Sequence, residues 1–290
     1  MRRAVIDIGT NTVKLLVAEV RQGQVVPMVA KDCTTRLGEG VDDSKRLLPS
    51  AMARTVRAIQ DFLAEAKGMG ATDCVAVATS AARDAANRDE FLAQVRQVCG
   101  LEMELISGDR EAELIFLGVS SDPEWSGARI LVADVGGGSA EFIQGAGGKM
   151  EIFRSLPLGA LRLTEKFGKG RFAELCEYLT RTLRDALAGY DASGCRMIAT
   201  GGTMVTLARV EGGAVDHATI SRAKLQVLVR RLEAMPLAKR KKVPGLPPER
   251  ADIIVAGGAV LLTAMEVLKA SELTVSVRNL RYGALVSDTK

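Results

Sequence analysis

The sequence predicts an α/β protein made of two related domains. Short apolar runs alternate with segments of helical spacing, the pattern of a sheet with helices packed against it. One motif begins each half of the chain, at Asp7 and again at Asp134: an apolar run, Asp, an apolar residue, Gly, two further residues, then Thr or Ser. The length of 290 residues also exceeds the usual size of one domain. We therefore expect one domain at 1–123 and a second at 124–290.

The first half begins with a predicted hairpin. The chain at 4–20 is apolar on both sides of a polar turn at 9–12, which indicates strand, turn and strand. The other predicted elements of this half are strands at 24–30, 73–78 and 101–106, a loop at 79–83, and helices at 50–67 (with Ser50 as N-cap), at 87–98 and from Ser107 onward. These elements complete an α/β pattern within the first half.

The second half repeats the opening theme, because 129–143 again predicts strand, turn and strand. Two later segments, 197–203 and 253–259, each predict a buried strand that ends in Gly-Gly and leads into a helix. Helical spacing also predicts a helix at 172–187. The segment 222–250 is rich in Lys and Arg and contains four prolines, so we expect a solvated helix face followed by a loop.

The two turns place charged side chains at symmetric positions. If 136–139 turns a hairpin about its middle, Asp134 and Glu141 lie opposite each other, and the same count sets Asp7 opposite Lys14. Turns rich in Gly, Thr and Ser present backbone N–H and hydroxyl donors with little side-chain obstruction. Such donors suit phosphate, and paired carboxylates suit Mg²⁺.

Composition excludes several classes of function. His217 is the one histidine of the chain, which argues against a Ser-His-Asp set and multi-histidine metal sites and leaves acid–base work to carboxylates. The net charge of +4 permits anionic ligands, whereas 4% aromatic residues give few platforms for stacking bases, so we expect no nucleic-acid partner. Five cysteines without a C-x-x-C pair indicate reduced thiols. No apolar run reaches about 18 residues, so we expect a cytoplasmic protein with no membrane segment.

Six segments carry a resemblance to a known family. They are DIGTNTVKL at 7–15, ATSAAR at 78–83, ISGDREAELIFLGV at 106–119, DVGGGSAE at 134–141, TGGT at 200–203 and GGA at 257–259. In this order they resemble the exopolyphosphatase and guanosine pentaphosphate phosphohydrolase (Ppx/GppA) family of the actin-like ATPase superfamily. The resemblance implies two actin-like, ribonuclease-H-like domains, each a mixed sheet with flanking helices, around a phosphate-binding cleft.

The resemblance also implies roles for individual residues. Glu111 matches the catalytic base that activates water, and Asp134 with Glu141 matches an acidic pair associated with Mg²⁺, for which Mn²⁺ is an alternative. Contacts to phosphate are implied for Asp7, Gly9, Thr10, Asn11, Lys14, Arg83, Gly136, Gly137, Gly138, Ser139, Gly201, Gly202 and Thr203. This arrangement agrees with the needs of phosphoryl transfer, which are positioning, charge neutralisation and an oriented nucleophile.

The implied activity is Mg-dependent hydrolysis of the terminal phosphate of inorganic polyphosphate, which makes the protein a phosphoric anhydride hydrolase. Alternatives are hydrolysis of guanosine pentaphosphate (pppGpp), transfer of phosphate from ATP, and a non-catalytic regulator that binds an alarmone or nucleotide. Arg110 and Glu113 reverse the family's charges around the proposed base, and Ala140 replaces a frequent Thr. From the length of 290 residues we expect no C-terminal extension of the kind that longer members carry. Family members often form homodimers, so the resemblance also implies a possible homodimer. Arg230, Arg231 and the cations at 239–242 are candidates for steering a long polyanion.

Overall fold

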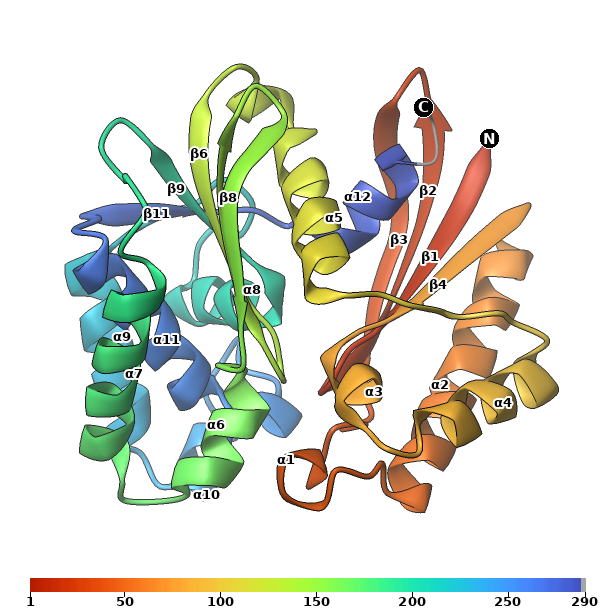
Figure 1. The fold of residues 1–290 in the computed structure, drawn as a ribbon, viewed down its shortest axis with the longest axis horizontal. Helices are drawn as coiled ribbons and strands as arrows, with labels where there is room; N and C mark the ends of the chain where they lie inside the picture. The colour runs from red at the N-terminus through yellow and green to blue at the C-terminus, as the bar shows by residue number, and fades with distance from the viewer. Residues whose placement is uncertain (288–290) are drawn as a thin grey trace. The chain divides into compact units, whose positions relative to one another are not determined.

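The computed structural model describes residues 1–287, and their contacts divide the chain into two compact units (Figure 1). Within the described residues, the first unit contains 1–122 and 279–287, and the second contains 123–278. Each unit has one mixed sheet with flanking helices, which confirms the predicted fold class.

The sheet of the first unit combines an antiparallel hairpin with parallel strands. In spatial order its strands are β3 (Gln24–Thr34), β2 (Thr12–Arg21), β1 (Arg2–Ile8), β4 (Asp73–Ala78) and β5 (Glu104–Leu105). β1 pairs antiparallel with β2 and parallel with β4, and β4 pairs parallel with β5. The expected strand at 101–106 is therefore much shorter than predicted.

Helices cover both faces of this sheet (Figure 1). They are α1 (Val41–Ser44), α2 (Pro49–Gly68), α3 (Ser80–Asp84), α4 (Arg88–Cys99), α5 (Gly108–Ser120) and α12 (Leu280–Ser287). Ile6 of β1, Ile59 of α2 and Phe91 of α4 are fully buried in the common core. The α3 helix replaces the loop expected at 79–83.

The two predicted helix starts in this unit had different outcomes. The helix predicted from Ser107 onward is confirmed as α5, and Ser107 is its N-cap, because the Ser107 hydroxyl accepts the N–H of Arg110. The prediction that Ser50 caps α2 is wrong, since the helix begins at Pro49 and Leu48 is its N-cap. Proline fixes φ in the helical range and has no N–H to leave unsatisfied, so it favours the first helical position.

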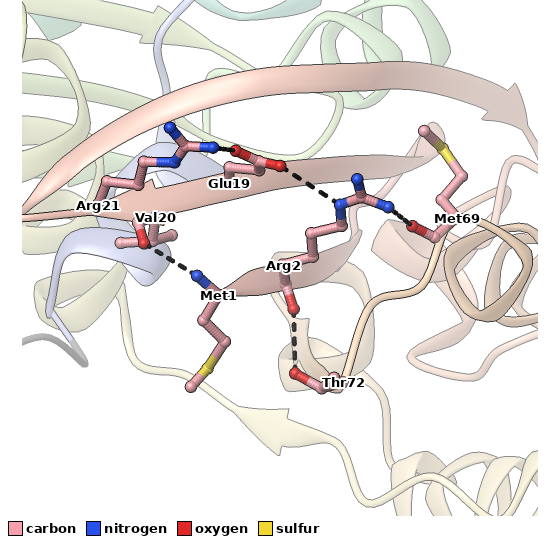
Figure 2. Close-up of polar contacts among 7 residues, drawn as sticks. All are labelled: Met1, Arg2, Glu19, Val20, Arg21, Met69 and Thr72. Atoms are coloured by element: carbon pink, nitrogen blue, oxygen red, sulfur yellow. Dashed lines mark hydrogen bonds and ion pairs between the residues drawn. The ribbon is translucent and has the colours of Figure 1, made fainter.

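Side chains at the start of β1 anchor the strand to two other elements (Figure 2). Arg2 Nε lies 3.4 Å from Glu19 Oε1 on β2, and Arg2 Nη1 donates to Met69 O at the end of α2 (3.0 Å). Thr72 Oγ1 donates to Arg2 O (3.2 Å). These contacts support the β1 register that sets the position of Asp7.

The second unit is built on a six-stranded sheet of similar plan. In spatial order its strands are β10 (Thr219–Ser221), β11 (Glu272–Val275), β9 (Arg196–Thr200), β6 (Arg129–Val135), β7 (Ala140–Ala146) and β8 (Lys149–Leu156). β6, β9 and β11 are parallel, whereas β7 and β8 continue from β6 as an antiparallel meander. The hairpin predicted at 129–143 is confirmed.

One buried helix, α11, organises the helical layer of the second unit (Figure 1). The helices are α6 (Ala160–Phe167), α7 (Phe172–Ala186), α8 (Gly201–Glu211), α9 (Arg222–Ala234), α10 (Leu237–Arg240) and α11 (Ile254–Val267), with short 3₁₀ turns η1 (Pro123–Trp125) and η2 (Pro248–Arg250). The strand expected at the start of 253–259 is wrong, because that run is already helical. A helix buried on nearly all sides has no polar stripe, so its apolar run resembles a buried strand.

The second unit ends earlier than the predicted second domain at 124–290, because helix α12 packs in the first unit. A Cβ on Gly283 would lie 1.8 Å from Leu114 O of α5, and one on Gly118 would lie 2.1 Å from Asn279 O. Arg281, which is buried, donates from Nη1 to Leu15 O (2.8 Å). Two glycines far apart in sequence therefore let the backbones of α5 and α12 touch.

The cysteines and the apolar helices bear on the expectations of reduced thiols and of no membrane segment. All five cysteines are free, and burial with the nearby Asp73 carboxylate raises the pKa of the Cys74 thiol to about 11. Among residues 1–287, no helix has both the length and the apolar character needed to cross a bilayer.

We predict that Gly283→Ala destabilises the first unit by about 1–3 kcal/mol, because the new methyl group would overlap the α5 backbone. Gly68→Ala is the matched control: this helical glycine has open space around its Cβ position, so alanine should add up to about 1 kcal/mol of helix propensity. Urea denaturation of both variants measures the difference. Equal stability of the two variants would contradict the close packing of α5 and α12.

Candidate active site

Three parallel strands of the first unit end side by side, and predicted site residues follow each of them. Ile8 of β1 is level with Ala78 of β4. The alignment continues past the strands, because Thr79 N–H donates to Ile8 O (3.2 Å) and Ile106 N–H donates to Ala78 O (3.1 Å). The β1–β2 turn, α3 and the start of α5 therefore lie together at the carboxyl ends of these strands, where open α/β sheets commonly bind ligands.

The first loop, residues 9–12, joins β1 to β2. Asp7 is paired with Lys14 across the hairpin, as predicted, and their carboxylate oxygen and ammonium nitrogen lie 3.6 Å apart. Thr10 and Asn11 are buried, yet within the described residues the Thr10 hydroxyl and Asn11 Oδ1 have no hydrogen-bond partner. A buried polar group without a partner is unfavourable, so the loop retains polar capacity that suits a ligand.

The chain that follows β3 holds the carbonyl groups of the first loop. Gly38 N–H donates to Thr10 O (2.9 Å), and the N–H groups of Thr35 and Arg36 donate to Asn11 O (3.1 and 3.0 Å). A trans peptide directs its C=O and the following N–H in opposite directions. The Asn11 N–H is therefore directed away from the donor that binds the Thr10 carbonyl.

Glu111 lies in the first turn of α5, where Arg83 of α3 contacts it. Arg83 Nη1 lies 3.3 Å from Glu111 Oε2 and donates to Ile106 O (3.1 Å). Glu111 is only 8% exposed, so a guanidinium balances a carboxylate that is largely closed to solvent. The structure thus brings together the residues that the resemblance assigns to water activation and to phosphate.

The two charges that depart from the family pattern pair with each other. Arg110 Nη1 lies 2.7 Å from Glu113 Oε2, and both side chains are substantially exposed. Their opposite charges offset one another along the surface of α5. The reversed order therefore places no isolated charge beside Glu111.

In the second unit, Asp134 of β6 and Glu141 of β7 face each other, as predicted. They are 9% and 2% exposed, respectively, and Ser155 Oγ donates to Glu141 Oε1 (2.8 Å). Directly opposed residues of an antiparallel pair project from the same face of the sheet, with Cβ atoms about 5 Å apart. Two carboxylates on one face fit the hard oxygen ligands that Mg²⁺ prefers.

The end of β9 adjoins this pair of carboxylates. Thr200 is level with Asp134 in the parallel pairing of β6 and β9, and a Cβ on Gly201 would lie 2.0 Å from Asp134 Oδ1. Thr203 Oγ1 donates to Val135 O (2.9 Å). The Gly-Gly turn, Gly201–Gly202 at the start of α8, thus packs directly on Asp134. The Thr203 hydroxyl links α8 to β6 by a hydrogen bond.

The second loop, 136–139, is held by the first turn of α6. Its carbonyl groups accept N–H groups from the start of that helix: Gly136 O from Ala160 (2.9 Å), Gly137 O from Leu161 (2.9 Å) and Gly138 O from Gly159 (3.2 Å). Because each peptide is trans, the N–H groups of Gly137, Gly138 and Ser139 all turn away from these donors. Consecutive N–H groups that turn to one side, as these do, are the donors of a nest of the kind that binds anions.

Arg250 is a further candidate site residue, which in sequence is one of many cations in the basic segment 222–250. It is buried, and a Cβ on Gly202 would lie 2.2 Å from its Nη1. Arg250 therefore lies against the same Gly-Gly turn that contacts Asp134. No local motif separates it from neighbouring cations, so only the packing identifies it.

Known proteins match nearly the whole chain. The sequence profile of the Ppx/GppA phosphatase family matches residues 16–290. Exopolyphosphatase 1 of Mycobacterium tuberculosis is 34% identical over 99% of this chain and 88% of its own length. The guanosine-5'-triphosphate,3'-diphosphate pyrophosphatase of Vibrio vulnificus is 30% identical over 97% of this chain and 58% of its own length.

A solved structure agrees with the sequence matches. The crystal structure of the Ppx/GppA family member from Aquifex aeolicus covers 100% of this chain and 97% of its own, with a TM-score of 0.83 and 29% identity. The match extends over both units and their mixed sheets. The chain therefore belongs to the Ppx/GppA phosphatase family, a group of phosphohydrolases with the actin-like two-domain fold.

Proposed function

We propose that this protein is an exopolyphosphatase that removes the terminal phosphate of inorganic polyphosphate. The supporting observation is the nest of N–H groups at 137–139, which continues from the strands that carry Asp134 and Glu141. A phosphate chain needs donors for its oxygens and a cation to offset its charge. This loop and the adjacent carboxylates offer both functions within one unit.

Asp134 and Glu141 would hold a divalent cation, for which Mg²⁺ is the best fit. When bound, Mg²⁺ offsets charge on the phosphate oxygens and orients them. In the second unit, the N–H groups of the second loop would bind phosphate oxygens. In the first unit, the Thr10 hydroxyl is a further candidate donor. Lys14 and Arg83 supply positive charge in the first unit.

Glu111 is the proposed general base. Its carboxylate takes a proton from water as the water oxygen bonds to the terminal phosphorus, and the bond from that phosphorus to the bridging oxygen breaks. The shortened chain leaves with the bridging oxygen and its electron pair. Arg83 supports this role because its guanidinium fixes the Glu111 carboxylate at 3.3 Å.

Guanosine pentaphosphate is the second candidate substrate, since the Vibrio vulnificus relative is named for such an activity. Both candidates present a terminal phosphoanhydride, so the same residues would act on either. Phosphate release from long polyphosphate, pppGpp and ATP, measured side by side, separates the alternatives. Turnover of pppGpp alone would exclude the polyphosphate assignment, and turnover of none of them would favour a nucleotide-binding regulator.

We predict that Glu111→Gln reduces the rate of phosphate release by roughly 10²–10⁴-fold, because the amide cannot accept the proton from water. The matched control is Glu113→Gln, which alters an exposed residue two positions further along α5. Single-turnover measurement with saturating polyphosphate separates chemistry from binding. Full activity in the Glu111 variant, with normal far-ultraviolet circular dichroism, would exclude Glu111 as the base.

We predict that Asp134→Asn raises the Mg²⁺ concentration for half-maximal activity by at least about tenfold, because one anionic ligand is lost. Glu151→Gln, on the neighbouring strand β8, removes a carboxylate that pairs with Arg129 and should leave this concentration unchanged. Titration of chelator-treated protein with Mg²⁺ measures both. An unaltered Mg²⁺ requirement in Asp134→Asn would refute the assignment of this ligand.

The basic segment 222–250 leaves fewer cations available to a polyanion than its composition suggests. Lys224 lies 3.0 Å from a carboxylate oxygen of Glu211, and the Arg230 guanidinium lies 5.0 Å from the ring centre of Phe172. Arg240 donates to four backbone carbonyls, those of Leu232, Glu233, Met235 and Ala251. Exposed side chains suited to steering remain at Arg231, Lys239, Lys241 and Lys242.

We predict that charge reversal at Lys239, Lys241 and Lys242 raises KM for long polyphosphate about tenfold at low salt and much less for tripolyphosphate, because steering grows with the charge of the ligand. Arg240 stays unchanged because it is structural. Reversal at Lys31, Lys45 and Lys67 in the first unit gives the same net charge as a control. Equal effects on both chain lengths, or an equal effect of the control, would contradict steering by this segment.

A further inference from the structure

The peptide between Gly138 and Ser139 in the second loop is held by a backbone donor and by a side-chain donor. Gly138 O accepts two hydrogen bonds, one from Gly159 N–H (3.2 Å) and one from Arg162 Nε (2.9 Å). The Arg162 N–H also donates to Gly137 O (3.2 Å). Arg162 therefore contacts two successive carbonyls of the loop, one through its backbone and one through its side chain.

The direction of the Arg162 side chain follows from its place in α6. Side chains of a helix lean toward its N-terminus, and Arg162 stands in the first turn of α6, three residues after the N-cap Gly159. A Cβ on Gly159 would lie 2.3 Å from Gly137 O. The helix start is thus close enough for a half-buried guanidinium to reach back to Gly138 O.

We propose that Arg162 is a positioning residue, whose Nε fixes the Gly138–Ser139 peptide so that the Ser139 N–H stays aimed at a phosphate oxygen. The inference rests on the proposed function, because it assigns a phosphate to the nest. The carbonyl and the N–H of one trans peptide move together. Release of the Gly138 carbonyl therefore lets the Ser139 N–H turn away.

Three substitutions separate the hydrogen bond from the positive charge. Arg162→Gln keeps an N–H donor at the position of Nε, because both side chains have three carbons before that nitrogen, but it removes the charge. Arg162→Lys keeps a charge and places a methylene group at that position. Arg162→Met has neither the donor nor the charge. Arg240→Met is the control for lost stability, since Arg240 also binds carbonyls of the second unit but lies outside the loop.

Binding is measured in a Glu111→Gln background, by calorimetry with tripolyphosphate at fixed free Mg²⁺. We expect affinity within about twofold of the parent for Arg162→Gln, and about tenfold weaker binding for both Arg162→Lys and Arg162→Met, the loss expected for one charge-assisted hydrogen bond. In the active chain, kcat/KM should fall in the same order. Arg240→Met should lower Tm without changing affinity.

A measurement without ligand keeps this inference separate from the proposed function. Amide hydrogen exchange reports the N–H groups of Gly159, Ala160 and Leu161, which donate to the loop. Their exchange should be about tenfold faster in Arg162→Met and Arg162→Lys and close to the parent rate in Arg162→Gln.

Two results would overturn the positioning role. One is unchanged exchange in Arg162→Met. The other is stronger tripolyphosphate binding by Arg162→Lys than by Arg162→Gln, which would indicate direct contact between the charge and phosphate. A parent chain that binds no tripolyphosphate, yet shows the expected exchange pattern, would refute the phosphate assignment and retain Arg162 as the residue that orients the loop.

Discussion

The loops at 9–12 and 136–139 both depend on hydrogen bonds in which their carbonyl groups accept N–H groups from a neighbouring segment. A trans peptide exposes its N–H on the side opposite to its C=O, so a donor segment on one side of a loop creates an anion-binding surface on the other. In the second loop this donor segment is the first turn of α6, whose N–H groups would otherwise lack partners. One set of bonds therefore satisfies a helix terminus and turns three backbone donors to the opposite side of the loop.

The two units apply this constraint in the same order along the chain. In each unit, a hairpin is followed by a third antiparallel strand. The chain then returns to the loop of that hairpin, 9–12 in the first unit and 136–139 in the second. The returning segment has a glycine where the approach is closest. A Cβ on Gly38 would lie 2.3 Å from Thr10 Cγ2, and one on Gly159 would lie equally near Gly137 O. The loops differ in their own chemistry, since the first has the buried polar side chains of Thr10 and Asn11 and the second has three consecutive glycines followed by Ser139.

Much of this arrangement was predictable from the sequence because it is local. A turn with symmetric flanks sets the pairing of Asp134 with Glu141 by counting alone, and Ser107 marks a helix start by its position before an apolar run. Contacts between distant segments were not predictable. The burial of Arg250 against the Gly-Gly turn depends on tertiary packing that no local pattern records. The same holds for α12, because Gly118 and Gly283 each look like an ordinary helical glycine until their helices meet.

Arginine has a second use in this fold, which changes how the composition should be interpreted. Guanidinium groups donate to backbone carbonyls in both units: Arg83 to Ile106 O, Arg162 to Gly138 O, Arg281 to Leu15 O, and Arg240 to four carbonyls. Such carbonyls need donors, and arginine offers five in a rigid fork. A net charge of +4 therefore overstates the positive charge that a polyanion meets. Under the proposed function, substrate recognition would depend instead on backbone N–H groups, a few exposed lysines and the cation that the paired carboxylates would hold.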